Sequence, residues 1–260
     1  MSGRLTTLLS GKGGVGRTML ASSLGTLLAR GGKRTALVDL NTGMRGLDMA
    51  LGLESRAAFD LGDVLDGVCG VKQALCRGED GLCLLAGRQV CDTEALDERR
   101  LEKIIAHLRT EFDWVLLDAA GGIGRGLTAA ARLGGEAIAV TTPDDAAIRC
   151  AERAAGVWTR AGGQTPMLCV NRIDASLVQE GLQYAPETCA QVLDMYLLGV
   201  VPEDEQALRA GLKKQPVCGD FPAARGIENL LCRMENPKEK LWNWNPQPEK
   251  KQPFWRRRKA

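Results

Sequence analysis

One glycine-rich loop near the N-terminus has the spacing of a pattern with known chemistry. Positions 11–18 read Gly-Lys-Gly-Gly-Val-Gly-Arg-Thr, between a short apolar run and a helical pattern. Glycines allow several backbone N–H groups to point toward one centre, and the N-terminus of a following helix adds partial positive charge there. This order matches the pattern G-x-x-x-x-G-K-[ST], which binds phosphate groups when it joins a strand to a helix. The sequence therefore predicts a phosphate site, and the alternative is a glycine-rich turn that binds nothing.

Two cations and a hydroxyl in this loop have separate expected roles. Arg17 stands where the pattern has lysine, and its longer, forked side chain is not equivalent to lysine at a tight phosphate site. Thr18 is expected to coordinate Mg²⁺, and Lys12 is an additional lysine near the start of the loop. We predict that all eight residues contact the ligand: Gly11, Lys12, Gly13, Gly14, Val15, Gly16, Arg17 and Thr18.

The rest of the chain alternates short apolar runs with longer helical patterns. The predicted strands cover residues 5–10, 35–39, 82–86, 114–118, 137–142, 167–170 and 197–201. The predicted helices cover residues 18–30, 93–109, 126–133, 144–160, 186–194 and 203–213. Near-continuous apolar strands such as VLLDA are typical of a sheet that is covered on both faces. We therefore expect an α/β fold with a doubly wound, mostly parallel sheet, helices on both faces, and ligands at the carboxyl ends of the strands.

Composition restricts the class of protein. The 260 residues are 45% hydrophobic and 25% charged, which excludes a largely disordered chain. We see no apolar run long enough to span a membrane and no signal peptide, so we expect a cytoplasmic protein. The nine cysteines contain no C-x-x-C pair, which disfavours a disulfide framework and a zinc or iron–sulfur site. We expect them to be small buried packing residues.

Longer segments extend the pattern beyond the loop. ALVDLNTGMRGLDMALGLESRAAFDLGDVLDG, DWVLLDAAGGIGRG, LCVNRI and LLGVVPEDEQALRAGLKKQPV occur in this order along the chain. Together with the loop, they resemble the MinD branch of the MinD/ParA deviant Walker-A P-loop ATPases over about residues 3–218. The resemblance implies an enzyme that binds ATP or ADP with Mg²⁺ and converts ATP and water to ADP and phosphate. It also implies that Lys12 reaches the nucleotide of a partner subunit in an ATP sandwich homodimer.

The resemblance assigns roles to polar residues at two strand ends. Asp39 and Asp118 would hold Mg²⁺ together with Thr18, directly or through water, although Asp118 could instead cap the next turn. Asn41 stands where the family has an aspartate that orients the attacking water, and an amide cannot accept a proton as a carboxylate does. Because Arg17 also replaces the lysine of the loop, we expect nucleotide binding to persist more readily than turnover. The predicted catalytic residues are Lys12, Asn41 and Asp118.

Two further segments would form the base pocket of the nucleotide. In the family, an asparagine after a strand reads the adenine edge with its amide, and here that residue is Asn171, followed by Arg172. Pro202 and Glu203, after the next strand, would complete the pocket. For Asn171 alone, a side-chain turn at the strand end is the alternative.

The C-terminal end differs from the rest of the chain. From residue 236 onward, eight Lys/Arg face two Glu, a net charge of +6, which leaves −4 for the preceding residues. We predict an ATPase domain at 1–235, a proline-rich linker at 236–253 and a basic-aromatic tail at 254–260. The residues expected to bind an anionic membrane are Phe254, Trp255, Arg256, Arg257, Arg258 and Lys259. The alternatives are a solvated tail and, less favoured, nucleic-acid binding.

Three functional hypotheses follow from these observations. The first is an ATP-dependent switch that dimerises, associates with the inner face of the cell membrane and helps to place the division septum. Its partners would be a MinC-like division inhibitor and a MinE-like activator. The second is a hydrolysis-deficient pseudo-ATPase that acts as a scaffold, and the third is a ParA-type partitioning relative on the same fold. A metal-cluster carrier of the same superfamily is disfavoured, because the chain has no C-x-x-C.

Overall fold

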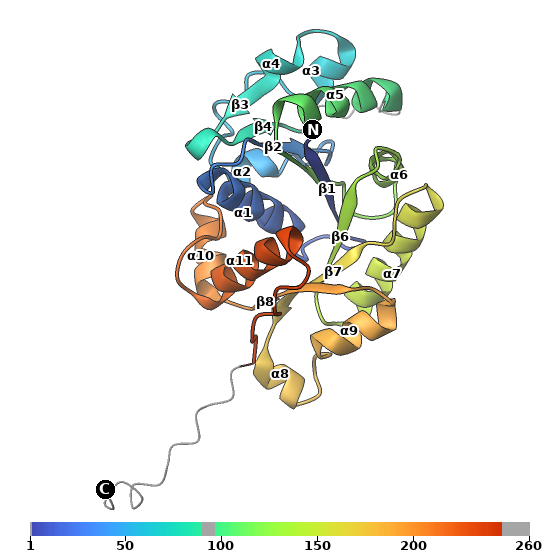
Figure 1. Cartoon of the computed structure of the whole chain (residues 1–260), viewed down its shortest axis with the longest axis vertical. Helices are drawn as coiled ribbons and strands as arrows, with labels where there is room; N and C mark the ends of the chain where they lie inside the picture. The colour runs from blue at the N-terminus through green and yellow to red at the C-terminus, as the bar shows by residue number, and fades with distance from the viewer. Residues whose placement is uncertain (1, 90–96, 246–260) are drawn as a thin grey trace, which may run out of the picture.

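A single sheet organises the molecule (Figure 1). The computed structural model describes residues 2–89 and 97–245, and in these ranges eight strands pair in the order β3-β4-β2-β5-β1-β6-β7-β8. Neighbouring strands run parallel except β3 and β4, which pair antiparallel at one edge. The strands are β1 (Arg4–Leu9), β2 (Thr35–Asp39), β3 (Leu75–Arg77), β4 (Cys83–Leu85), β5 (Trp114–Asp118), β6 (Glu136–Thr141), β7 (Met167–Ile173) and β8 (Leu197–Pro202).

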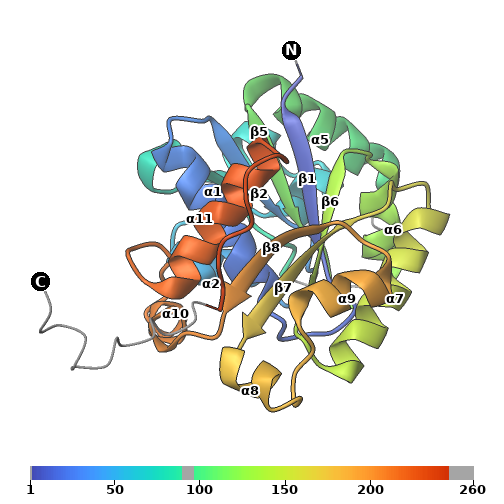
Figure 2. The same ribbon diagram turned by 60° about the horizontal axis from the view of Figure 1, so that its bottom comes forward.

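Helices cover both faces of this sheet, with α1 and α11 on one side and α6 and α7 on the other (Figures 1 and 2). The longer helices are α1 (Arg17–Arg30), α5 (Glu98–Glu111), α6 (Arg125–Arg132), α7 (Asp145–Arg160), α9 (Pro186–Leu193), α10 (Glu205–Leu212) and α11 (Pro222–Glu235). The shorter ones are α2 (Leu47–Ala50), α3 (Leu61–Asp66), α4 (Val71–Ala74), the 3₁₀ turn η1 (Glu79–Gly81) and α8 (Ala175–Gln179). No helix in the described part of the chain is both long enough and apolar enough to cross a membrane.

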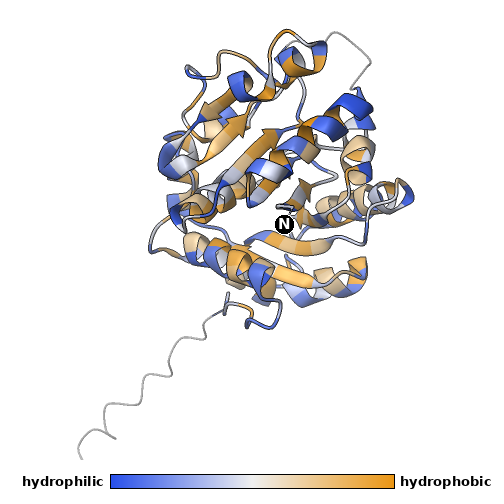
Figure 3. Cartoon of the chain, turned by 45° about the horizontal axis from the view of Figure 1, so that its top comes forward, coloured by the Kyte–Doolittle hydropathy of each residue, from blue (hydrophilic) through white to orange (hydrophobic). Residues whose placement is uncertain are grey.

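The apolar strands explain why the sheet lies in the middle. Side chains of a strand alternate between its two faces, so a strand buried on both faces must be apolar throughout. On β5, Val115 and Leu117 belong to one core cluster, and Trp114 and Leu116 belong to the other. Figure 3 shows the strands mostly in the hydrophobic colour, while the surrounding helices mix both colours. The predicted α/β fold with a doubly wound, mostly parallel sheet is confirmed.

The seven predicted strands are all present, with ends that shift by at most three residues. The predicted helix at 203–213 begins later, at Glu205, because the carboxylate of Asp204 caps it by accepting from the N–H of Gln206. The helix predicted at 93–109 is present from Glu98, and its first four predicted residues lie outside the described ranges. The edge strand β3 was not predicted, since three residues are too short for a periodic pattern.

Helix α11 was also absent from the prediction. Pro222 at its first turn and Gly226 in its interior read as helix breakers. Gly226 has a packing reason instead, because a Cβ there would lie 2.7 Å from the carbonyl oxygen of Val200 on β8. The buried residues Ala223 and Ile227, spaced four apart, were the signal that could have revealed the helix.

The described cysteines correct another expectation. All eight are free thiols, but only four of them are buried, three are intermediate and Cys232 is exposed, while Cys91 lies outside the described residues. Burial raises the pKa of Cys169 to about 12 and that of Cys189 to about 11, so these two are neutral packing residues.

Residues 236–245, the described part of the predicted linker, lie against β8 and α11. Arg233 on α11 donates from Nε to the carbonyl oxygen of Leu198 at 2.6 Å and from Nη1 to that of Glu239. Asn229 donates to the carbonyl oxygen of Lys240 at 2.9 Å and accepts from the N–H of Trp242 at 2.9 Å. The chain is therefore attached to the domain up to Trp242. Residues 246–253 of the linker and the tail at 254–260 lie outside the described part of the structure.

Arg233 should be a stability determinant. The residue is 7% exposed, and its side chain donates to the backbone carbonyl oxygens of Leu197 and Leu198. Arg233→Ala therefore leaves buried acceptors without a donor. We expect the free energy of unfolding to fall by about 2–3 kcal/mol in urea titrations. Arg225→Ala is the matched control on the same helix, since Arg225 forms an exposed pair with Asp220, and its loss should cost about 0.5 kcal/mol or less. Equal losses in the two variants would contradict the role of Arg233.

Candidate functional site

The loop between β1 and α1 needs glycine at several positions. Gly14 and Gly16 have φ of 79° and 92°, in the left-handed region that favours glycine. A Cβ on Gly11 would lie 1.8 Å from the carbonyl oxygen of Cys150 on α7. The loop is thus tightly fixed at its start by a neighbouring helix and at its end by backbone conformation.

Asn171, at the end of β7, bonds this loop directly. Its Nδ2 donates to the carbonyl oxygen of Val15 at 2.8 Å, and the residue is 1% exposed. A Cβ on Gly16 would lie 2.2 Å from the same Nδ2. Gly16 therefore makes room for the amide, and the amide connects two strand ends that are far apart in sequence. The predicted contact of Asn171 with an adenine base is not tested by this geometry.

Two adjoining cavities lie at the carboxyl ends of the strands. The first, of about 630 Å³, is lined by all eight predicted loop residues together with Asn41 and Arg172. The second, of about 230 Å³, lies beside α10 and includes Asn171, Pro202 and Glu203. Gly16, Met19 and Arg172 line both. The structure therefore brings the predicted phosphate-side and base-side residues to two neighbouring cavities.

Asp118 does not line either cavity, but it receives two hydrogen bonds from the loop. It is fully buried, and its Oδ1 accepts from Nε of Arg17, while its Oδ2 accepts from the hydroxyl of Thr18 at 2.7 Å. Nη1 of Arg17 donates to the hydroxyl of Ser10 at 2.9 Å. The loop arginine thus forms a buried ion pair with the acid that ends β5. Ser10 was not identified from the sequence, since its partner is set by the fold.

Asp39 organises the segment that follows β2. Its Oδ1 accepts from the N–H of Asn41 at 2.8 Å, and its Oδ2 accepts from the N–H groups of Gly46 and Leu47 at 2.9 and 3.0 Å. Burial, together with the negative charge of Asp118 on the neighbouring strand, raises the pKa of Asp39 to about 6. The carboxylate oxygens point at backbone N–H groups, so Asp39 contributes charge and loop structure at this end of the sheet.

Lys12 lies on the exposed side of the loop. Its Nζ is 3.4 Å from Oδ1 of Asp144, which also caps α7 by accepting from the N–H of Ala147. Burial acts to raise the pKa of Asp144, but the hydroxyl of Thr142, the capped N–H and Lys12 hold it below its ordinary value. A third cavity, of about 450 Å³, opens here beside Lys12, Asp144 and Arg172. Asp144 was missed by sequence reasoning, although its place directly after a strand and before a helix was a usable signal.

Arg172 follows Asn171 in an unusual backbone conformation. Its φ of 59° is in the left-handed region, at an irregularity in the pairing of β7 with β8. Its Nε lies 3.8 Å from Oε2 of Glu203. In this conformation Arg172 lines all three cavities described above.

Comparisons with known proteins identify the family. A family model described as CobQ/CobB/MinD/ParA nucleotide binding domain covers residues 6–217. The septum site-determining protein MinD of Bacillus subtilis (strain 168) is 37% identical over 222 residues, 84% of this chain and 83% of that protein. The chain belongs to the MinD family. MinD of Escherichia coli (strain K12) is 31% identical over 245 residues, which are 88% of this chain and 91% of that one.

Solved structures that resemble this chain belong to the same family. A chain of the MinC:MinD cell division protein complex of Aquifex aeolicus has a TM-score of 0.84 at 30% identity, covering 92% of this chain and 98% of that chain. MinD of Pyrococcus horikoshii OT3, solved in complex with Mg-ADP, has a TM-score of 0.78 at 25% identity, covering 90% and 96%. The protein is thus a member of a nucleotide-binding ATPase family of septum site determination.

The glycine positions of the loop can be tested separately. Gly16→Ala forces a side chain into the left-handed region and against Asn171, so it should lower the free energy of unfolding by about 1–3 kcal/mol. Gly13→Ala is the control in the same loop, because a Cβ there meets nothing within 4 Å, and its effect should stay within about 0.5 kcal/mol. Urea titration of both variants measures the difference. If Gly16→Ala is as stable as Gly13→Ala, then the contact between Asn171 and the loop is wrong.

Proposed function

We propose that this MinD-family chain is a nucleotide-dependent switch. It binds ATP with Mg²⁺, forms a homodimer in the ATP state, and associates from the cytoplasm with the inner face of the cell membrane to help place the division septum. The observation that carries this proposal is the pair of adjoining cavities formed by the glycine loop, Asn171 and the end of β8. The first offers Lys12, Arg17 and Thr18 to a phosphate chain. The second offers apolar side chains such as Val201, Leu208 and Leu212 to a base.

The donor groups of the loop support a nucleotide phosphate and a metal. Arg17 and Lys12 supply positive charge, and the N-terminus of α1 points its N–H groups to the same hollow. Thr18 and Asp118 carry oxygen ligands of the kind that Mg²⁺ prefers, and Asp39 adds negative charge behind them. Bound there, Mg²⁺ would neutralise charge on the phosphate oxygens. The chain's own contribution is to position the phosphates and, through Asn41, the water.

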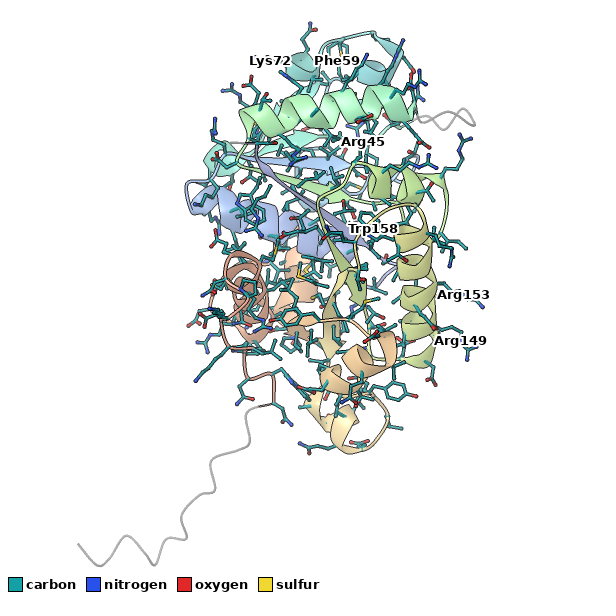
Figure 4. The ribbon with its side chains drawn as sticks, turned by 45° about the vertical axis from the view of Figure 1, so that its right-hand side comes forward. Arg45, Phe59, Lys72, Arg149, Arg153 and Trp158 are labelled. Carbon is teal, nitrogen blue, oxygen red and sulfur yellow. The ribbon has the colours of Figure 1, made fainter. Side chains whose placement is uncertain are left out.

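The exposed side of the loop supports dimerisation. Lys12 is half-exposed and held by one long contact with Asp144, so it is free to exchange that carboxylate for a phosphate of another subunit. A MinC-like inhibitor is proposed as a partner because a structural relative is a MinC:MinD complex. Arg149 and Arg153 point outward from α7 and offer a charged surface to such a partner (Figure 4). An activator of the MinE kind is proposed from the family resemblance.

A hydrolysis-deficient scaffold is the second candidate function. Asn41 lines the phosphate hollow where a carboxylate would accept a proton, and Arg17 is bonded to Asp118. Both features oppose turnover and leave binding groups in place. A partitioning protein of the ParA kind is less favoured, since a plasmid partition protein of Borrelia burgdorferi and a ParA family ATPase of Chlorobium tepidum share the fold at 16% and 17% identity.

Nucleotide binding and dimerisation should separate in two variants. Thr18→Ala removes a metal ligand, and we expect the affinity for Mg-ATP in calorimetry to fall roughly tenfold or more. Lys12→Ala should keep most of that affinity and lose the ATP-dependent dimer in sedimentation velocity. Lys33→Ala, which removes an exposed lysine after α1, is the control and should dimerise as the parent does. A Lys12→Ala dimer of parental strength would exclude Lys12 from the interface.

Turnover should be limited by the residues that replace the family's catalytic groups. Asn41→Asp restores a carboxylate beside the hollow, and combined with Arg17→Lys it should raise the rate of phosphate release by roughly tenfold or more. The rate is measured with and without anionic vesicles. Asn243→Asp makes the same change on the surface and should have no effect. A double variant no faster than the parent would place the defect elsewhere.

Membrane association should depend on residues 254–260. Their four cations each gain about 1 kcal/mol near an anionic surface, and the two aromatic rings add interfacial binding. Deleting them should abolish sedimentation with anionic vesicles and leave calorimetric nucleotide binding intact. Parental binding should be strongest with ATP and should weaken with salt. Vesicle binding that survives the deletion would remove the tail from the proposal.

A further inference from the structure

The buried pair of Arg17 and Asp118 occupies the groups that a metal would use. Arg17 is 7% exposed and Asp118 is fully buried. One carboxylate oxygen accepts from Nε of Arg17, and the other accepts from the hydroxyl of Thr18 at 2.7 Å. The neighbouring acid, Asp39, accepts hydrogen bonds from backbone N–H groups at both of its carboxylate oxygens. The oxygen ligands have the right chemistry for Mg²⁺, but each already has a partner within the chain.

The surroundings are shaped to hold the guanidinium in this place. Ser10 accepts a hydrogen bond from Nη1 at 2.9 Å, and its carbonyl oxygen accepts from the N–H of Gly122 at 3.0 Å. A Cβ on Gly121 would lie 3.4 Å from Nη1, in van der Waals contact. The segment after β5 therefore packs beside the planar, forked side chain that stands in place of a lysine, while Asp118 and Ser10 bond it.

A shared carboxylate makes the guanidinium and a metal competitors. Asp39 and Asp118 are register partners on adjacent strands, and both are buried. Oδ1 of Asp118 already accepts from Nε of Arg17, and the positive charge of Arg17 repels a divalent cation that approaches the same carboxylate. Charges at such short range in a poorly hydrated site interact strongly. Arg17 must then leave Asp118, or the metal must bind more weakly.

We propose that Arg17 is a built-in counter-cation of Asp118, which a divalent metal has to displace. Arg17 is a positioning residue. Because it holds the carboxylate of Asp118, it raises the Mg²⁺ concentration that nucleotide binding needs. This inference rests on the proposed nucleotide binding and deepens it.

The test is the Mg²⁺ concentration at half-maximal ADP binding, measured by titrating Mg²⁺ at a fixed concentration of fluorescently labelled ADP. Arg17→Met keeps most of the length and removes the charge, so the midpoint should fall roughly tenfold or more, as expected when a close charge no longer competes. Arg17→Lys keeps the charge without the fork and should give a smaller fall. Arg34→Met is the matched control, since Arg34 pairs with Asp113 at the opposite end of β2 and β5, and its midpoint should equal that of the parent.

A milder variant keeps the test valid if Arg17→Met does not fold. Ser10→Ala removes the hydrogen bond from the guanidinium and the one that the hydroxyl donates to the carbonyl oxygen of Lys12, and it leaves all charges in place, so its midpoint should fall roughly threefold. Equal midpoints in the parent and in the folded Arg17 or Ser10 variants would overturn the inference and leave the proposed function standing. Failure of the parent to bind ADP at any Mg²⁺ concentration would overturn both.

Discussion

The candidate site of this protein depends on one buried ion pair, between Arg17 at the start of α1 and Asp118 at the end of β5. Strands buried on both faces must place their polar residues at their ends, and the carboxyl ends of parallel strands meet at one edge. Two acids meet there, Asp39 and Asp118, and both are buried. Such a site requires a positive charge from within the chain or from a ligand, because unpaired buried charges are strongly destabilising.

The strand order explains why this pair involves the glycine loop. β1 lies between β5 and β6, so the loop that follows it is adjacent to the acid of β5 on one side and to Asp144, after β6, on the other. Arg17 pairs with Asp118, and Lys12 pairs with Asp144. One cation is therefore held inside the site and the other lies on the exposed face, where a second subunit of the proposed dimer would meet it. β7 adds Asn171 from one strand further.

The sequence was sufficient where local patterns decide the structure. The strands are apolar runs, and the loop at 11–18 combines glycine spacing with a strand and a helix, so both were predicted from short windows. The partners of Arg17 and Asn171 could not be predicted, since each bond joins residues that are about 100 or more positions apart. Helix α11 was missed because Pro222 and Gly226 read as helix breakers. Pro222 lies at the first turn, where proline is tolerated, and Gly226 meets a packing requirement of β8 that no local pattern contains.

The state of the Arg17 guanidinium tests this account most directly. Nitrogen–hydrogen correlation spectra of the arginine side chains report whether Nε–H is buried and bonded, and loss of one signal in Arg17→Lys assigns it. We predict a signal of Arg17 that is protected from exchange with water in the nucleotide-free protein and that moves when ADP and Mg²⁺ are added together. A signal that exchanges freely with water, or a protected signal that ADP and Mg²⁺ leave unchanged, would contradict the central role of the pair.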